Sequence, residues 1–219
     1  GANVCDTVQC QVFINKDDRL KTWPESKREE YWNKITEAVK DTSGEALVYD
    51  GKIIDEPLFF AVSGGKTENA LDVFKDNKPY LKSVESPGEE AAPKFKSVVK
   101  MSYLEFIKKI DAEYSNSNIN LLNVRNQIEI KNRNESGSVK EIRLGKTTIS
   151  GVKFRTIMGL NSTNFKIKFN SSNVEISCTG YGHGVGMSQW GANAMAKQGK
   201  SYKEILQHYY SGVEITKMK

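Results

Sequence analysis

The run GYGHGVGMSQWGA, Gly180 to Ala192, places a glycine at every second position from Gly180 to Gly186. A period of two is typical of an extended strand, and glycines at that spacing leave one face of the strand without side chains. The other face carries Tyr181, His183 and Val185. We therefore expect a short extended segment whose bare face admits a ligand or another stretch of backbone at close range.

The sequence leaves several roles open for His183. Its imidazole could hydrogen-bond to a sugar hydroxyl, bind a metal, or be a structural histidine bonded to the backbone. Its place in the glycine run, just before Ser188, Gln189 and Trp190, favours a functional role. The rings of Tyr181 and Trp190 could stack on sugars, or Trp190 could pack in the core beside Met187, Ala194 and Met195.

Upstream of this run, the chain from about 124 to 178 reads as strands with alternating apolar residues. They lie in NQIEIKNRNESGSVKEIRL, KTTISGVKF and FKIKFNSSNVEISCTG, with turns at 135–137 and 170–173. The alternation places Cys178 on the apolar face. We expect a buried core thiol there, since cysteine is among the most often buried residue types.

Helices flank these strands. PESKREEYWNKITEAVKD (24–41) has helical spacing, and Ser102 and Ser201 each precede a glutamate by three residues, which predicts two capped helices. Asp50-Gly51 between apolar runs predicts a β-hairpin. The fold class is α+β: a mixed, strand-rich domain with several helices. We expect residues 1–111 and 171–219 to form the main domain, and 112–170 an appended β-rich lobe.

The segment SGGKTENALDVF, Ser63 to Phe74, delivers polar groups after the apolar strand PLFFAVS. Gly64 and Gly65 break that strand sharply, and loops at strand ends often hold functional groups on a rigid frame. Glu68 is a candidate catalytic acid. The alternative is a charge at a helix N-terminus behind the capping residue Thr67. We expect this segment and the glycine run to face one cleft.

Near the N-terminus, Cys5 and Cys10 lie in CDTVQCQ. Two thiolates at that spacing can hold a metal, but tetrahedral zinc takes two further ligands. The sequence offers His183, His208 and carboxylates for these. A local disulfide and two reduced thiols are the competing interpretations.

Composition excludes some classes of function. Lys and Arg exceed Asp and Glu by five, 32 against 27, a mild excess without the concentrated patch of a nucleic-acid binder, so we expect no nucleic-acid partner. No stretch approaches the ~20 apolar residues of a membrane span. The sequence opens without an initiator methionine, and we interpret it as a fragment or processed form whose membrane anchor, if any, lies upstream.

Three longer blocks resemble the stage II sporulation protein D family, which also contains an amidase enhancer. They are FFAVSGGKTENALDVF with PYLKSVESPGEEAAP, ESGSVKEIRLGKTTISGVKFRTIMGLNSTNF, and GYGHGVGMSQWGANAMAKQGKSYKEILQHYYSGVEI. The resemblance spans essentially the whole chain, and GHGVGMSQ-W-GA is its most specific part. It implies action on cell-wall peptidoglycan, as a lytic transglycosylase (a lyase) that thins the septal wall during sporulation engulfment and leaves 1,6-anhydro-muramyl ends.

The resemblance also implies partners and site residues. The partners are peptidoglycan glycan strands and other engulfment proteins, and the location is extracytoplasmic, membrane-anchored at the sporulation septum. The family's catalytic glutamate lies upstream, so we expect the catalytic acid before Gly1, with Glu68 as second candidate. Zn²⁺ is implied at Cys5 and Cys10. The expected substrate contacts are Ser63, Gly64, Glu68, Tyr181, His183, Ser188 and Gln189.

Two other functions stay open. The chain could be a non-catalytic peptidoglycan-binding module that stimulates a partner amidase. It could also be a zinc hydrolase in which Cys5, Cys10 and His183 bind the metal that activates water, a reaction that would leave hydrated reducing ends.

Overall fold

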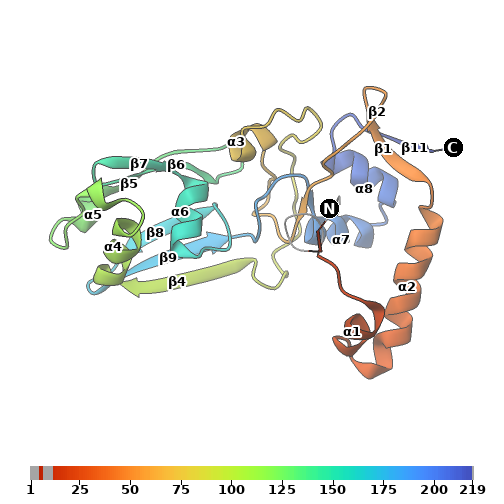
Figure 1. Cartoon of the computed structure of the whole chain (residues 1–219), viewed down its shortest axis with the longest axis horizontal. Helices are drawn as coiled ribbons and strands as arrows, with labels where there is room; N and C mark the ends of the chain where they lie inside the picture. The colour runs from red at the N-terminus through yellow and green to blue at the C-terminus, as the bar shows by residue number, and fades with distance from the viewer. Residues whose placement is uncertain (1–4, 7–11, 219) are drawn as a thin grey trace. The chain divides into compact units, whose positions relative to one another are not determined.

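The computed structural model describes residues 5–6 and 12–218. The chain divides into two compact units, residues 1–46 with 216–219 and residues 47–215. Helices and strands are interspersed along the chain, which confirms the mixed α+β class (Figure 1).

The chain contains α-helices, labelled α, and two short 3-10 helices, labelled η. They are α1 (Lys16–Lys21), η1 (Glu25–Lys27), α2 (Arg28–Asp41), α3 (Ala70–Phe74), α4 (Tyr103–Asp111), η2 (Ser115–Ser117), α5 (Val124–Gln127), α6 (Gly151–Met158), α7 (Gln189–Lys197) and α8 (Tyr202–Tyr209). The strands are β1 (Glu45–Tyr49), β2 (Lys52–Ile53), β3 (Phe59–Phe60), β4 (Lys96–Ser102), β5 (Ile128–Arg133), β6 (Val139–Leu144), β7 (Thr147–Ser150), β8 (Phe165–Phe169), β9 (Asn173–Thr179), β10 (Met187–Ser188) and β11 (Glu214–Lys217).

The first unit contains the helix expected at 24–41. Pro24 directly precedes η1, and the fixed φ of proline suits the start of a helix. α2 follows η1 and continues to Asp41. Gly44 follows with a φ of +76°. The ring of Trp23 meets Tyr31 edge-on with centroids 5.5 Å apart. The helix is confirmed.

The predicted hairpin is also confirmed. β1 and β2 pair antiparallel, with Tyr49 opposite Lys52. The two connecting residues, Asp50 and Gly51, have φ values of +50° and +73°. A type I′ turn requires positive φ at both positions, and Asp-Gly provides it with little strain.

The β-rich lobe has one core between two three-stranded sheets. The sheets have the orders β4-β9-β8 and β5-β6-β7. In Figure 1, α4 and α6 lie between them, where α4 contacts β4 and β9 and α6 contacts β6 and β7. The core cluster extends from Met101 to Cys178, a longer stretch than 112–170, because β4 pairs with β9 along its whole length. The division into domains stays a prediction.

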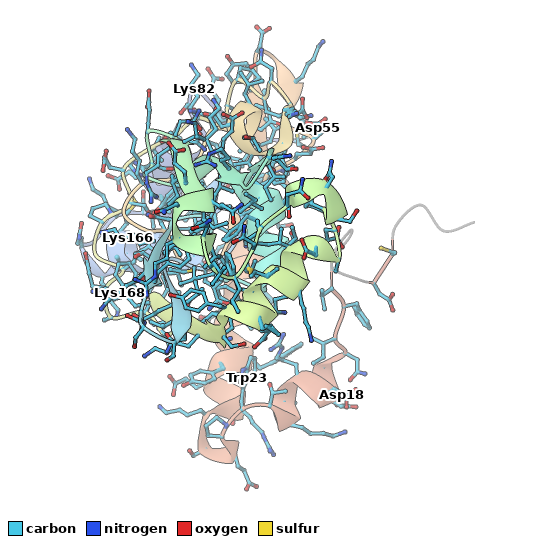
Figure 2. All side chains as sticks on the ribbon, turned by 90° about the vertical axis from the view of Figure 1, so that its left-hand side faces the viewer. Asp18, Trp23, Asp55, Lys82, Lys166 and Lys168 are labelled. Atoms are coloured by element: carbon cyan, nitrogen blue, oxygen red, sulfur yellow. The ribbon has the colours of Figure 1, made fainter. Side chains whose placement is uncertain are left out.

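The inner and outer faces of the sheet β4-β9-β8 follow the predicted alternation. Cys178 is 2% exposed on the inner face, which confirms the buried thiol. Lys166 and Lys168 of β8 point to solvent on the outer face (Figure 2).

One strand prediction was wrong. KTTISGVKF does not continue as a strand, because β7 ends at Ser150 and α6 begins at Gly151. The Ser150 side chain accepts a hydrogen bond from the backbone N–H of Lys153, and Gly159 closes the helix at a φ of +65°. A Cβ on Gly151 would lie 1.8 Å from the carbonyl oxygen of Val139, so only glycine allows this helix start so near β6.

A second core underlies the glycine run. It contains Tyr80, Leu81, Val185, Tyr209 and Tyr210. Beside it, the short strands β3 and β10 pair in parallel, with Phe60 opposite Ser188. The predicted capping box at Ser201 and Glu204 is present in full at the start of α8. Among the described residues, no helix is long and apolar enough to cross a membrane.

Candidate functional site

The glycine run is not the extended strand that its alternation predicts. Its four alternate glycines all have positive φ, with 88° at Gly180, 126° at Gly182, 85° at Gly184 and 78° at Gly186. Residues with a Cβ rarely adopt these angles. Glycine therefore occurs at every second position because the backbone has a positive φ there. Its period of two reflects turns in the chain and not a pleated strand.

The side of the run without side chains is filled by the protein itself. A Cβ on Gly186 would lie 2.0 Å from the carbonyl oxygen of Leu58, and one on Gly184 would lie 2.8 Å from Cγ of Glu68. The expected close approach of another backbone is therefore confirmed, and residues 58–68 are that backbone. They occupy the space that we expected a glycan to use.

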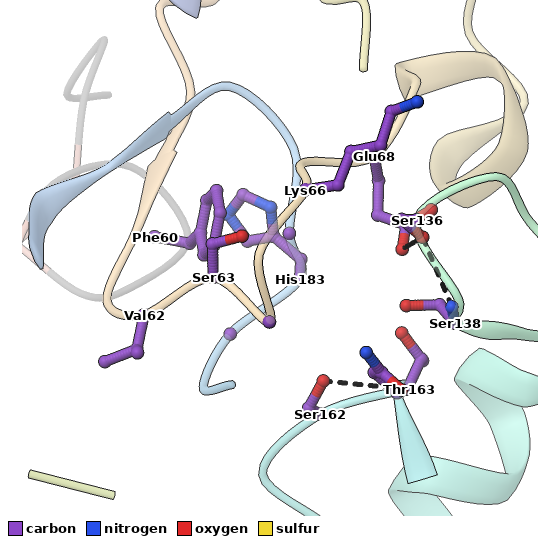
Figure 3. A pocket seen from close by; sticks show the side chains of 14 residues that line it. Phe60, Val62, Ser63, Lys66, Glu68, Ser136, Ser138, Ser162, Thr163 and His183 are labelled. Atoms are coloured by element: carbon purple, nitrogen blue, oxygen red, sulfur yellow. Dashed lines mark hydrogen bonds between the residues drawn. The ribbon is translucent and has the colours of Figure 1, made fainter. Parts of the chain in front are cut away.

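Backbone hydrogen bonds join the two segments directly. Val62 and Tyr181 exchange bonds of 3.0 and 2.7 Å, and the N–H of Glu68 donates to the carbonyl of Gly184 at 2.8 Å. Both segments then line one cleft, as predicted, with Glu68 and His183 among its walls (Figure 3).

The cleft is narrow and rich in hydroxyl groups. Its volume is about 20 Å³, which suffices for roughly one water molecule. Its hydroxyl-bearing residues are Ser63, Ser136, Ser138, Ser162 and Thr163, and Asn164 and Lys66 add an amide and an ammonium group. Such a space admits one hydroxyl group and not a whole sugar ring.

Glu68 is held inside this cleft at 3% exposure. One carboxylate oxygen accepts a 2.9 Å bond from the Asn134 side chain, and the other accepts from the Ser136 hydroxyl. Both donors come from the turn between β5 and β6. The capping interpretation fails, because α3 begins only at Ala70 and Thr67 instead accepts a bond from the N–H of Val84.

Asn134 adds a polar atom that has no hydrogen-bond partner among the described residues. Its Oδ1 is buried and accepts no hydrogen bond from the described part of the chain. A buried acceptor without a donor costs roughly 1 to 3 kcal/mol, so a donor supplied by water or a ligand would be stabilised there.

His183 is fixed by backbone groups on both sides of its ring. Its Nε2 lies 3.1 Å from the carbonyl of Phe59, and its Nδ1 accepts from the N–H of Val185 at 3.1 Å. This arrangement requires the proton on Nε2. Burial lowers the pKa of the imidazole, which therefore stays neutral. The bonds fit the structural interpretation of His183, with its ring forming part of the cleft wall.

A pH dependence of stability follows from His183. Because its pKa is lowered in the folded state, the unfolded chain binds a proton more readily below about pH 6.5, and stability falls as the pH falls through that value. Between about pH 7.5 and about pH 5.5, we expect His183→Asn to lose less stability than the wild type. Urea unfolding at both pH values measures this, and equal losses in the two proteins would contradict it.

The remaining predicted contacts lie elsewhere. Tyr181 is half-buried, and the ammonium of Lys94 lies 4.9 Å from its ring centroid. Ser188 is fully buried as the N-cap of α7, and Gln189 is exposed at the start of that helix. The cleft thus brings together Ser63, Gly64, Glu68 and His183, and it does not include Tyr181, Ser188 or Gln189.

Glu89, which no sequence pattern singled out, is 1% exposed. Its Oε2 accepts from the N–H of Ser63 at 2.8 Å and from the hydroxyl of Ser188 at 2.6 Å. Its Oε1 accepts from the hydroxyl of Ser86 at 2.6 Å, and that hydroxyl lies 2.6 Å from the Tyr209 hydroxyl. One carboxylate therefore joins the Ser63 turn, the start of α7 and, through Ser86, helix α8.

Burial raises the pKa of Glu89, and the hydrogen bonds from Ser188, Ser86 and Ser63 oppose that change. The residue lies in ESPGEEAAP, where proline, glycine and a neighbouring Glu90 predict an exposed loop. No local signal distinguishes the buried glutamate from the exposed one beside it.

The metal prediction falls mostly outside the described residues. Cys10 lies there, and Cys5 is half-buried. Within residues 5–6 and 12–218, no group of three or more His, Cys, Asp or Glu side chains is arranged to hold a metal ion. Zinc at Cys5 and Cys10 stays a prediction.

Comparison with known proteins bears on this site. A family model described as "Stage II sporulation protein" matches residues 1–49. Stage II sporulation protein D of Bacillus subtilis is 37% identical over 99% of this chain, and that of Bacillus amyloliquefaciens 38% over the same share. The chain belongs to the stage II sporulation protein D family. An amidase enhancer of Bacillus subtilis is 29% identical over 84% of the chain.

This member of the stage II sporulation protein D family spans 60% of the length of those two sporulation proteins and 33% of the amidase enhancer. The similarity to the two sporulation proteins extends over 216 residues. That stretch takes in the cleft residues and Glu89, so both lie within the part of the chain that carries the family resemblance.

Proposed function

We propose that this protein acts on the glycan strands of peptidoglycan as a lytic transglycosylase in sporulation engulfment. The observation that carries the proposal is the cleft of hydroxyl, amide and ammonium groups around the buried carboxylate of Glu68. These groups suit the hydroxyl and acetamido groups of an amino sugar. Membership of the stage II sporulation protein D family supports the same substrate.

The reaction needs one acid and no water. The acid protonates the glycosidic oxygen, and the bond from that oxygen to the muramic acid C1 breaks. The 6-hydroxyl of the same sugar attacks C1 to close a 1,6-anhydro ring, and its proton passes to the carboxylate that the acid has become. We propose that this acid is a residue upstream of Gly1, and Glu68 is the second candidate. In this chain Glu68 and the hydroxyls around it bind and orient the strand across the mouth of the narrow cleft.

Incubation of purified sacculi with a form of the protein that includes the residues upstream of Gly1 tests the proposal. Mass spectrometry should detect 1,6-anhydro-muramyl ends, and the Glu68→Gln variant should bind sacculi more weakly, since it removes the charge that orders Asn134 and Ser136. Glu105→Gln, at an exposed position on α4, is the matched control. Hydrated reducing ends would indicate a hydrolase and contradict the proposal.

The amidase enhancer among the relatives favours a second candidate, a binding module that stimulates a partner amidase. It predicts faster release of stem peptides when the protein is added to that amidase, with no cut in the glycan. The same sacculus digests distinguish the two functions.

Zinc at Cys5 and Cys10 is part of the proposal, as is a membrane-anchored location outside the cytoplasm at the septum. We expect about one zinc ion per chain by elemental analysis of protein purified without chelator, and its loss in a Cys5→Ser variant. Thermal unfolding should shift with chelation. A zinc-free protein with a Cys5–Cys10 disulfide by mass spectrometry would contradict this.

A further inference from the structure

A second, wider cleft lies beside α7. Its volume is about 270 Å³, and it shares no lining residue with the cleft around Glu68. That volume is near the lower end of the ~300 to 1,000 Å³ of small-molecule sites, a size for one ring-shaped unit. On the helix side it is lined by Trp190, Asn193, Ala194 and Lys197.

Helical spacing places these four residues on one face of α7, because positions i, i+3, i+4 and i+7 lie above one another. The opposite wall is the loop that contains Gly88 and Ala91. A Cβ on Gly88 would lie 3.4 Å from Cβ of Ala194, so small residues let the loop approach the helix at this point. The space left beside the indole ring of Trp190 is the cleft.

The polar groups around this space are available to a ligand. Trp190 is half-buried, and its backbone N–H donates to Ala61 at 3.2 Å. Its indole N–H, the amides of Asn193 and Gln198 and the ammonium of Lys197 have no hydrogen-bond or ion-pair partner in the described part of the chain. Together they offer one aromatic face, two amides and one positive charge.

This set matches a saccharide more closely than other ligands. A sugar ring has an apolar face that an indole can cover and a rim of hydroxyls that amides can bind. Among the described residues, no carboxylate lines the cleft, so a cationic ligand lacks a partner there, while Lys197 suits a ligand with a carboxylate.

We propose that this Trp190 cleft binds one N-acetylated sugar unit of a glycan strand, with the sugar face stacked on the indole and Lys197 facing the free carboxylate that muramic acid carries where no stem peptide is attached. The identity of the glycan as peptidoglycan rests on the proposed function. The stacked sugar would anchor the strand at a subsite separate from the cleft of Glu68.

Indole N–H signals in NMR test this subsite. The chain has three tryptophans, so each indole signal can be assigned by substitution. A tetrasaccharide of alternating N-acetylglucosamine and N-acetylmuramic acid is the probe. The Trp190 indole signal should shift on titration. Trp190→Ala should weaken the affinity about tenfold, as loss of one stacked ring does, and Trp190→Phe should weaken it less.

Trp32→Ala is the matched control, since Trp32 lies in α2 of the other unit. The affinity of this variant for the tetrasaccharide should equal that of the wild type. Thermal unfolding verifies that each variant is folded. An unchanged Trp190 signal at saturation, or equal affinity in folded Trp190→Ala, would overturn the proposal.

Pelleting with sacculi whose stem peptides have been removed separates this inference from the proposed function. Equal pelleting of the wild type and Trp190→Ala would contradict the proposed Trp190 subsite and leave the proposed peptidoglycan function intact. A tetrasaccharide-dependent shift without pelleting would support the saccharide site and contradict the peptidoglycan function.

Discussion

Glu89→Ala is expected to lower the free energy of unfolding by roughly 3 kcal/mol, because it leaves three buried donors without an acceptor. The donors are the N–H of Ser63 and the hydroxyls of Ser86 and Ser188. The two hydroxyls can turn toward other acceptors, but the Ser63 N–H cannot. Urea unfolding at neutral pH measures the loss.

Glu89→Gln keeps the shape of the side chain and removes its charge, so its loss should be much smaller. Glu90→Gln, at the exposed neighbouring position, should change stability by less than about 0.5 kcal/mol. A Glu89→Ala protein as stable as Glu90→Gln would show that the carboxylate does not hold these elements together.

The contribution of Glu89 to the stability of the protein should depend on pH. Since burial raises its pKa, the folded protein keeps a proton that the unfolded chain has released above about pH 4.3, and this contribution to stability falls as the pH rises through the folded pKa. Glu89→Gln lacks that titration. Its stability relative to the wild type should therefore improve as the pH rises from about 4 to about 7, and a constant difference would contradict the raised pKa.

Gly186→Ala is expected to be destabilising by roughly 3 kcal/mol or more, from two separate causes. The φ of +78° disfavours any residue with a Cβ, and that Cβ would lie 2.0 Å from the carbonyl oxygen of Leu58. A backbone carbonyl cannot move away as a flexible side chain can. β3 and β10 would have to separate, because Leu58 and Gly186 directly precede the paired residues Phe59 and Met187.

Gly199→Ala provides the matched control, because Gly199 has a φ of +86° with no atom within 4 Å of the added Cβ. It isolates the cost of the backbone angle, about 1 to 2 kcal/mol. Chemical unfolding of both variants gives the difference, which reports the steric clash alone. Equal losses would mean that the contact between Leu58 and Gly186 relaxes without cost.

Local signals predicted much of the fold. Asp50-Gly51, the Ser201 capping box and the apolar face of Cys178 each depend on residues a few positions apart, so the sequence alone was sufficient. The same approach failed for α6. Its first turn depends on Ser150 and on the carbonyl of Val139, which lies on a neighbouring strand.

The candidate site shows the same division between local and distant information. The sequence placed Glu68 and His183 near each other, since both lie next to glycine breaks after apolar strands. It did not predict that Asn134 and Ser136, more than sixty residues away, supply the donors to Glu68. Those contacts form only when the turn between β5 and β6 packs beside Glu68 in the folded chain.

The sequence by itself determined that four glycines must alternate through 180–186, and that this run belongs to the site. Only the tertiary structure decided why: the glycines adopt positive φ and admit the backbone of 58–68, so the side we expected to face a ligand faces the protein. A spacing of two specifies which side chains are absent, but not which φ the chain adopts. The φ values depend on hydrogen bonds to residues over a hundred positions away, such as those between Val62 and Tyr181, and these exist only in the folded chain.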